Sequence, residues 1–148
     1  ENGKILENGQ ADAFFLNDGQ GRFLPVPFVT GKFTDEDGKP LVSPPYDWGL
    51  SVMMRDINGD THPDLYVCND FKSPDRVWIN RGDGTFKEFS GPSGLSSTDG
   101  SMGIAWGDYN NDQMMDLYIS NYTGEADLLL TMIDNTSSND GKSGWMKS

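Results

Sequence analysis

Basic residues, cysteine and long apolar runs are all scarce in this 148-residue sequence. The 11 Lys and Arg residues stand against 23 Asp and Glu, which gives a net charge of −12. Such a charge would repel phosphates, so nucleic-acid binding is disfavoured. Apolar runs stay short of the roughly 18 residues that a membrane helix needs, so the sequence predicts no membrane span.

A single cysteine, Cys68, means that no internal disulfide can form. Cys68 lies inside an apolar run, which favours a packed strand residue. No Cys/His pair at nucleophile spacing supports a catalytic thiol. In an exported protein the stability would then come from another source, and a bound metal ion is one candidate.

Glycine and aromatic residues are well represented, with 18 Gly and 11% Phe, Trp and Tyr, while hydrophobic residues make up only 35%. This mixture suits a β-protein with many tight turns better than a helical bundle. The length is sufficient for one ordinary domain with a core. We therefore predict an all-β fold.

The sequence repeats itself at an offset of 52 residues. The repeat superposes 52–67 on 104–119, and its identities fall mainly on oxygen-bearing positions. The matching pairs are Asp56/Asp108, Asn58/Asn110, Asp60/Asp112, Asp64/Asp116, Leu65/Leu117, Tyr66/Tyr118 and, further on, Asn69/Asn121. Identities of this kind indicate a shared chemical task.

A second motif recurs at a different offset, because 15–23 is similar to 78–86. Both segments have an apolar strand end, an Asn-x-Gly-x-Gly turn and an aromatic residue that opens the next strand, which is a hairpin signal. Strands are expected over 50–55, 65–69, 77–80 and 85–89. Four short strands in a unit of about 50 residues are typical of a β-propeller blade.

The pattern predicts about two and a half blades of four antiparallel strands. The expected division is the end of a preceding blade over 1–23, an inserted loop over 24–48, a blade with the first Asp/Asn-rich loop over 49–90, the start of a second blade with the second loop over 91–125, and a C-terminal segment over 126–148. A short hairpin is expected around Gly38 in the insert. The apolar run 126–133 is compatible with a strand or a short helix.

Each Asp/Asn-rich loop, between the first and second strands of its blade, places alternate oxygen donors where they can converge on one cation. Counting Asp56 as position 1, positions 3, 5 and 9 are also oxygen-bearing, and position 7 would offer its backbone carbonyl. The candidate ligands are Asp56, Asn58, Asp60, His62 and Asp64 in one loop, and Asp108, Asn110, Asp112, Met114 and Asp116 in the other. This donor set suits calcium, so we predict two calcium ions.

Other ions and motifs fit these loops less well. Magnesium would require a stricter octahedron with more water, and zinc would require His or Cys. An EF-hand needs Gly at position 6 and Glu at position 12, whereas the first loop has Thr61 and Val67 there. An acidic turn without any ion is the alternative, although three unneutralised carboxylates so close together would repel one another.

The segments 56–65, 108–117 and 78–86 resemble the FG-GAP/VCBS repeat family, which builds the β-propeller of integrin α-chains and many bacterial surface proteins. Residues 103–110 are most similar to the cartilage-acidic-protein-like (ASPIC/UnbV) subgroup. The literal Phe-Gly and Gly-Ala-Pro elements are missing, and the usual Gly at loop position 6 is replaced by Thr61 and Gln113. The resemblance implies calcium ligation by side chains at positions 1, 3, 5 and 9 of each loop.

The resemblance also implies an exported protein (extracellular, cell-surface or periplasmic) that binds proteins or glycans without catalysis. The expected function is a calcium-stabilised adhesion or structural module, as a fragment of a longer propeller protein. One alternative is a subunit of a larger envelope or extracellular assembly that contacts neighbouring subunits. A glycan-active enzyme is another, with Asp47, Asp70, Asp75 and Glu88 as its candidate acids.

Overall fold

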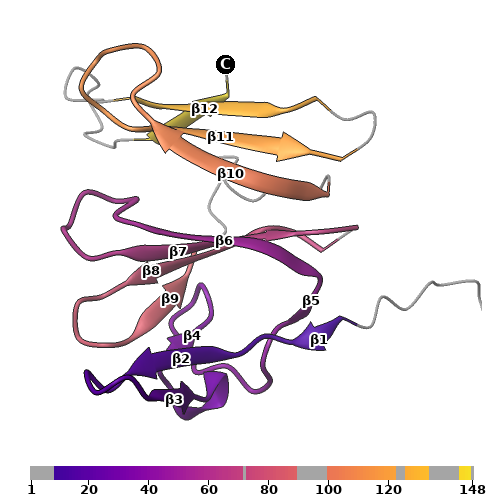
Figure 1. Cartoon of the computed structure of the whole chain (residues 1–148), viewed down its shortest axis with the longest axis vertical. Helices are drawn as coiled ribbons and strands as arrows, with labels where there is room; N and C mark the ends of the chain where they lie inside the picture. Colours follow the sequence, from indigo (N-terminus) through magenta and orange to yellow (C-terminus); the bar gives the residue numbers. More distant parts are fainter. Residues whose placement is uncertain (1–8, 72, 90–99, 123–125, 134–143, 148) are drawn as a thin grey trace, which may run out of the picture.

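The structure, a computed structural model, describes residues 9–71, 73–89, 100–122, 126–133 and 144–147. Its elements are β-strands and one 3-10 turn, stacked in layers (Figure 1). Among the described residues no helix is long and apolar enough to cross a membrane. The predicted all-β class is therefore confirmed.

The first blade is an antiparallel meander in the middle of the stack (Figure 1). Its strands are β6 (Gly49–Arg55), β7 (Asp64–Asn69), β8 (Arg76–Asn80) and β9 (Phe86–Glu88), which pair in that order. Each predicted strand of this unit is thus present, within one or two residues.

The second blade repeats this arrangement above the first. Its strands are β10 (Ser101–Gly107), β11 (Asp116–Asn121), β12 (Leu128–Ile133) and β13 (Gly144–Lys147), again in antiparallel order. The apolar run that was compatible with strand or helix is therefore a strand. The second blade thus includes two strands, β12 and β13, in the C-terminal segment to which the sequence assigned no definite structure.

The two blades share one hydrophobic core, because alternate side chains along each strand point to opposite faces. Tyr66 and Cys68 of β7 and Val77 of β8 face the second blade. They pack on the side chains that the second blade turns toward them, which are Leu117, Ile119, Leu128, Leu130 and the partly buried Ile104 and Trp106.

The opposite face of the first blade has its own core of aromatic residues. Leu65 and Trp78 pack there against Phe28, Phe33 and Phe86. The Phe33 ring stacks on the Phe86 ring with centroids 5.1 Å apart and meets Trp78 edge-on at 5.2 Å. Residues from the insert thus cover this face, so β7 and β8 are buried on both sides.

The predicted insert, 24–48, is more structured than a loop. It contains the end of β3 (Phe23–Val26), the 3-10 turn η1 (Phe28–Thr30), β4 (Phe33–Thr34) and β5 (Tyr46–Asp47). Strand β4 pairs in parallel with β9 and adds a fifth strand to the first blade. The expected turn at Gly38 is present, since the Gly38 amide donates to the Asp35 carbonyl.

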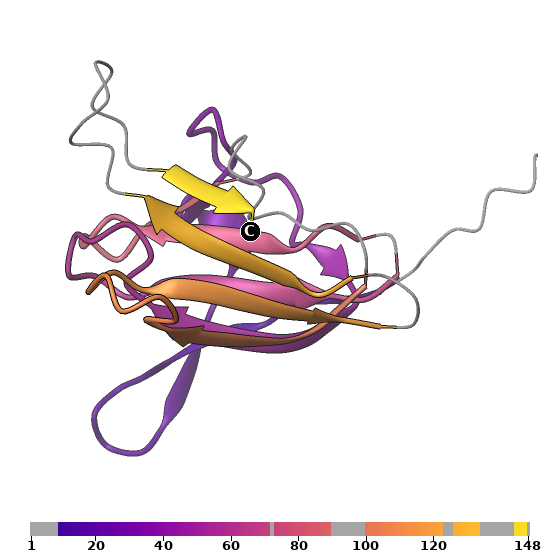
Figure 2. The same cartoon turned by 90° about the horizontal axis from the view of Figure 1, so that it is seen from above.

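The predicted N-terminal hairpin is β2 (Phe14–Asn17) paired with β3, and it forms a separate two-stranded sheet. It projects from the stack (Figure 2). Only its base packs on the first blade, where the Phe14 ring meets Phe33 and Phe86 edge-on. Strand β1 (Gln10–Ala11) pairs with β5 beside it.

Candidate metal-binding loops

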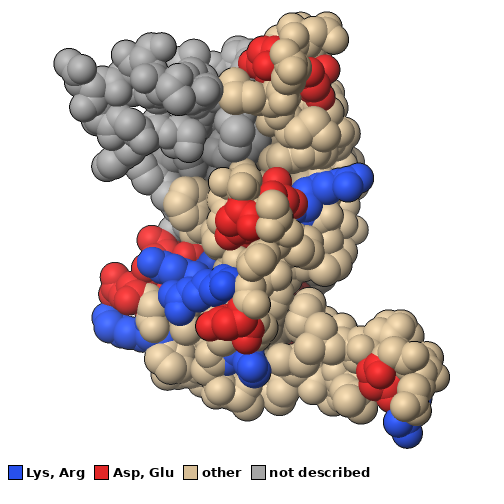
Figure 3. Space-filling model, turned by 90° about the vertical axis from the view of Figure 1, so that its left-hand side faces the viewer, with Lys and Arg blue, Asp and Glu red and all other residues tan. Residues whose placement is uncertain are grey.

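The two Asp/Asn-rich loops lie at the same end of the stack, each between the first and second strands of its blade (Figure 1). Viewed onto that end, acidic side chains gather in separate patches at the heights of the two loops (Figure 3). This position follows from the antiparallel meander, because equivalent turns of stacked blades meet at one edge.

Asp56 organises the first loop from inside. Its Oδ1 accepts hydrogen bonds from the amides of Gly59 (2.8 Å) and Asp60 (3.0 Å), and its Oδ2 accepts one from Thr61 (2.8 Å). One carboxylate therefore satisfies three backbone donors of a chain that turns around it. Such turns are the usual task of Asp and Asn.

Asn58 and Asp60 face each other on the outer side of this loop. The Asn58 side-chain amide donates to Asp60 Oδ2 at 2.9 Å, and Asp60 Oδ1 accepts from the His62 amide at 2.8 Å. The Asn58 bond, followed by the His62 amide, lowers the pKa of the exposed Asp60 carboxyl below its usual value. Asp60 is therefore ionised at neutral pH, in the form that binds a cation.

Asp64 closes the loop from beneath and is completely buried. Its Oδ2 accepts from the Ile57 amide (2.8 Å) and its Oδ1 from the Asn80 amide (2.7 Å) on β8. Burial raises the pKa of this carboxyl, and the two amide bonds oppose that effect. Asp64 thus ties the loop to the third strand of the blade.

The second loop has the same architecture. Asp108 accepts from the amides of Asp112 (3.1 Å) and Gln113 (3.0 Å), and Asp116 Oδ2 accepts from the Tyr109 amide at 2.8 Å. It differs at the closing residue, because the buried Asp116 Oδ1 has no hydrogen-bond partner in the described part of the chain. The equivalent oxygen of Asp64 has one.

The donor set is of the hard-oxygen type that calcium prefers. Among the described residues, however, no three His, Cys, Asp or Glu side chains gather into a cluster that could hold a metal ion. The loop carboxylates are instead turned toward their own backbone amides. Among the described loop residues, the buried Oδ1 of Asp116 lacks a hydrogen-bond partner. A buried unpaired carboxylate oxygen costs about 1–3 kcal/mol.

Position 7 differs between the loops, as expected for a position whose side chain is free to vary. The His62 ring lies against the β8–β9 turn, where a Cβ on Gly82 would come within 1.9 Å of His62 Nε2. Met114 is half-buried, and its amide donates to Asp112 at 2.8 Å. The structure thus assigns both side chains to packing.

A further repeated element escaped the sequence reasoning. Tyr66 donates its hydroxyl to Asp75 Oδ2 (2.9 Å), and Asp75 Oδ1 accepts from the Asn69 amide (2.8 Å). In the second blade Tyr118 donates to Asp127, and Asp127 accepts from the Asn121 amide at 2.9 Å. We call each Tyr–Asn–Asp trio a clip.

The signal for the clip was present in the sequence. Asp75 and Asp127 are 52 residues apart, the same offset as the loops. Both residues lie outside the loop motif. Their shared role became visible only in the structure, where each Asp accepts hydrogen bonds from a Tyr hydroxyl and an Asn amide.

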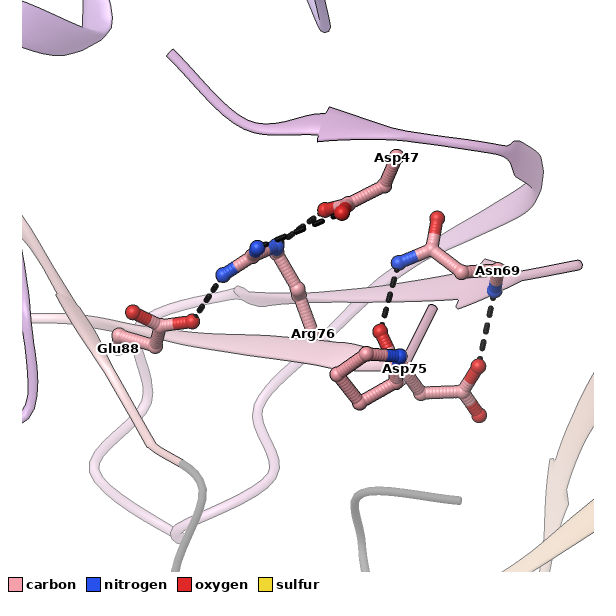
Figure 4. A network of polar contacts seen from close by, with 6 residues as sticks. Asp47, Asn69, Asp75, Arg76 and Glu88 are labelled. Atoms are coloured by element: carbon pink, nitrogen blue, oxygen red, sulfur yellow. Dashed lines mark hydrogen bonds and ion pairs between the residues drawn. The ribbon is translucent and has the colours of Figure 1, made fainter. Parts of the chain in front are cut away.

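The four acids considered for glycan cleavage have other partners. Arg76 forms ion pairs with Asp47 of β5 and Glu88 of β9, and thereby fastens the insert to the blade (Figure 4). Asp75 belongs to the first clip, and Asp70 Oδ1 accepts from the Phe71 amide at 2.7 Å. The two acids that do come close, Asp47 and Glu88, are joined through a guanidinium, so both serve the fold.

Comparison with known proteins agrees with this repeat geometry. Residues 56–119 match the family described as FG-GAP-like repeat. This segment is thus similar to FG-GAP-like repeats. The match begins at the first residue of the first loop and ends in β11, so it includes both loops and the whole of the first blade beyond β6.

Two curated relatives contain sequence similar to this FG-GAP-like repeat region. Cartilage acidic protein 1 of Xenopus tropicalis is 28% identical over 91 residues, which is 61% of this chain and 14% of the relative. Cartilage acidic protein 1 of Homo sapiens is 30% identical over 88 residues, which is 59% of this chain and 13% of the relative. The chain thus spans about one seventh of their length. No solved structure matches it.

Proposed function

We propose that this chain is a non-enzymatic, calcium-stabilised binding or structural module of an exported protein. The observation that carries the proposal is the duplicated loop, with Asp, Asn, Asp and Asp at the same four positions 52 residues apart. Similarity to proteins named cartilage acidic protein supports an extracellular setting. Millimolar extracellular calcium fills even weak sites.

Two features of the loops, close carboxylates and an unpaired carboxylate oxygen, support the binding of a stabilising cation. Asp56 and Asp60 lie in one short exposed turn of a chain with net charge −12, so like charges are held close together. In the second loop, the buried Asp116 Oδ1 has no donor among the described residues. A cation would offset the repulsion and satisfy that oxygen. The candidate side-chain ligands are those at positions 1, 3, 5 and 9 of each loop.

Thermal unfolding with calcium or with excess EGTA tests this proposal. Calcium should raise the midpoint strongly, since a ligand at 100 times its Kd adds about 2.7 kcal/mol per site. Calorimetric titration should give two sites. A melting curve that excess EGTA leaves unchanged would overturn the proposal.

A matched pair of variants makes the test specific. Asp60→Asn should weaken calcium binding in the first loop, because it removes a charged ligand but keeps the shape of the side chain. Asp83→Asn removes the same charge from another exposed turn, where Asp83 accepts from the Thr85 amide (2.9 Å). Equal loss of the calcium effect in both variants would indicate general charge screening in place of a site.

A role in a larger assembly is the second candidate, and one face of the second blade favours it. Tyr66 is 0% exposed because the second blade covers it, whereas Tyr118, its equivalent, is 42% exposed. A groove of about 370 Å³ lies on this uncovered face, lined by Ala105, Trp106, Gly107, Asp108, Tyr109, Asp116, Tyr118 and Leu129. Because the second blade covers the equivalent face of the first blade, the partner that we expect to cover this groove is another blade of the same type.

Sedimentation velocity over a concentration series tests this candidate, with a second copy of the chain as the available blade. Leu129→Lys should weaken self-association at least about tenfold, the effect of 1.4 kcal/mol. Val42→Lys makes the same change on the exposed insert and should leave association unchanged. A chain that stays monomeric at every concentration would exclude self-association through this face.

A further inference from the structure

A pocket lies between the projecting β2–β3 hairpin and the loop end of the first blade, on the hollow side seen in Figure 3. Its volume is about 390 Å³, within the range of small-molecule sites. The lining residues are Phe14, Leu16, Val26, Lys32, Phe33, His62, Pro63, Asn80, Gly82, Gly84 and Phe86. Three parts of the chain that are distant in sequence therefore form its walls.

The inner wall is aromatic and held firmly in place. Phe14 meets Phe33 edge-on at 5.5 Å and Phe86 at 5.6 Å, and Phe33 stacks on Phe86. These rings belong to the buried core of the blade, so the wall exists without a ligand. Leu16 is half exposed on the hairpin side, where it offers an apolar surface that no described part of the chain covers.

Among the described residues that line the pocket, the one charged side chain is that of Lys32. Lys32 and His62 line it, and no Asp or Glu does. In the described part of the chain, neither Lys32 nor His62 forms an ion pair with an acidic side chain. The exposed Lys32 side chain places an ammonium beside an apolar wall on a chain with net charge −12. It favours a ligand that carries a negative charge.

The Asn80 side chain is held in place by hydrogen bonds on both its nitrogen and its oxygen. Its side-chain nitrogen donates to the Pro63 carbonyl (3.1 Å) and its side-chain oxygen accepts from the Gly82 amide (3.0 Å). The Lys32 and His62 side chains form no hydrogen bond within the described part of the chain, and they are therefore the main candidates to contact a ligand.

Gly82 keeps the His62 ring at the pocket. A Cβ there would lie 1.9 Å from His62 Nε2, and the φ of Gly82 is +73°, in the left-handed region. A side chain at this position would displace the ring and strain the turn. The His62 ring of the first Asp/Asn-rich loop thus packs against the β8–β9 turn at Gly82.

We propose that this pocket binds a small carboxylate that carries an aromatic or branched aliphatic body. The carboxylate pairs with the Lys32 ammonium and accepts a hydrogen bond from the His62 ring. The apolar body lies against Phe14, Leu16 and Val26. The pocket proposal does not depend on calcium binding, because its side chains are not the predicted calcium ligands. His62 belongs to both sets, but its ring would contact the carboxylate, whereas its backbone carbonyl would contact calcium.

Titration of the 15N-labelled protein with 3-phenylpropionate, followed by two-dimensional NMR, tests the proposal. The expected shift changes centre on Leu16, Lys32 and Phe86. The neutral analogue 3-phenylpropanol should bind at least about tenfold more weakly, because it lacks the carboxylate that pairs with Lys32, and tenfold corresponds to about 1.4 kcal/mol. Equal binding of acid and alcohol, or no binding of the acid, would overturn the proposal.

Two lysine variants complete the test. Lys32→Gln should weaken 3-phenylpropionate binding about tenfold or more while it keeps most of the side-chain length. Lys39→Gln is the control, because Lys39 is exposed and already pairs with Asp37 at 2.7 Å. Both lysines are at the surface, so both variants should fold, and equal melting midpoints would verify this. Unchanged affinity in Lys32→Gln, or equal loss in both variants, would refute the role of Lys32.

Discussion

At the scale of single residues, position 6 of each loop is held in a strained backbone conformation. Thr61 has φ +73° and Gln113 has φ +70°, and both belong to the left-handed region that favours glycine. A β-branched residue such as Thr61 is especially unfavourable there. Two positions earlier the loops use Gly59 and Asn111, which tolerate the same conformation. Within the two loops, strain is therefore concentrated at position 6.

Replacement of Thr61 by Gly should stabilise the protein. The change removes steric strain of about 1–2 kcal/mol, while the greater freedom of glycine in the unfolded chain cancels part of that gain, so we expect about 0.5–1 kcal/mol. A higher urea midpoint with an unchanged m-value would demonstrate it. Thr61→Ala, which keeps the Cβ, should gain less. If alanine stabilised as much as glycine, backbone strain would not be the cause.

At the scale of elements, the sequence predicted best what is encoded by local pattern. The Asn-x-Gly-x-Gly turns at 17–21 and 80–84 specify hairpins by themselves, and both hairpins are present. The strands β6–β9 follow from their apolar runs and turn residues. The loop geometry around Asp56 and Asp108 also follows locally, because the hydrogen bonds join residues at most five apart.

Elements that depend on distant partners could not be predicted in the same way. Strand β4 has two residues, and its pairing with β9 joins Phe33 to Phe86 across 53 positions. The ion pairs of Arg76 reach Asp47 in the insert, which the sequence presented only as a Pro-rich interruption. The clip was hidden for a related reason, since Tyr66 lies on β7 and Asp75 lies just before β8. Calcium itself stays a prediction, because no contact described here tests it.

At the scale of the whole molecule, the two blades are joined by polar contacts as well as by their shared core. The Ser101 hydroxyl at the start of β10 hydrogen-bonds to Asp75 of the first clip. Its oxygen also lies 3.3 Å from Asn121 Oδ1 of the second clip. Ser101 and Asp75 are both buried. A buried network of this kind links the folding of one blade to that of the next.

The pH dependence of stability should report on this link. Burial raises the pKa of Asp75, and the hydrogen bonds from Asn69, Ser101 and Tyr66 offset that effect only in part. The folded protein therefore binds this proton more tightly than the unfolded chain does. Lowering the pH from the raised pKa of Asp75 toward 3.8, its value in an unfolded chain, should increase the contribution of Asp75 to stability.

The difference in unfolding free energy between the wild type and Asp75→Asn, measured by urea denaturation across that pH range, isolates this effect from the other acids. The difference should shift in favour of the wild type as the pH falls. Asp83 gives a control of opposite sign, since hydrogen bonds from Thr85 lower its pKa. The advantage of the wild type over Asp83→Asn is present above 3.8 and should be lost as the pH falls through that lowered pKa. A difference for Asp75 that stays flat, or that follows Asp83, would show that burial between the blades does not control this carboxyl.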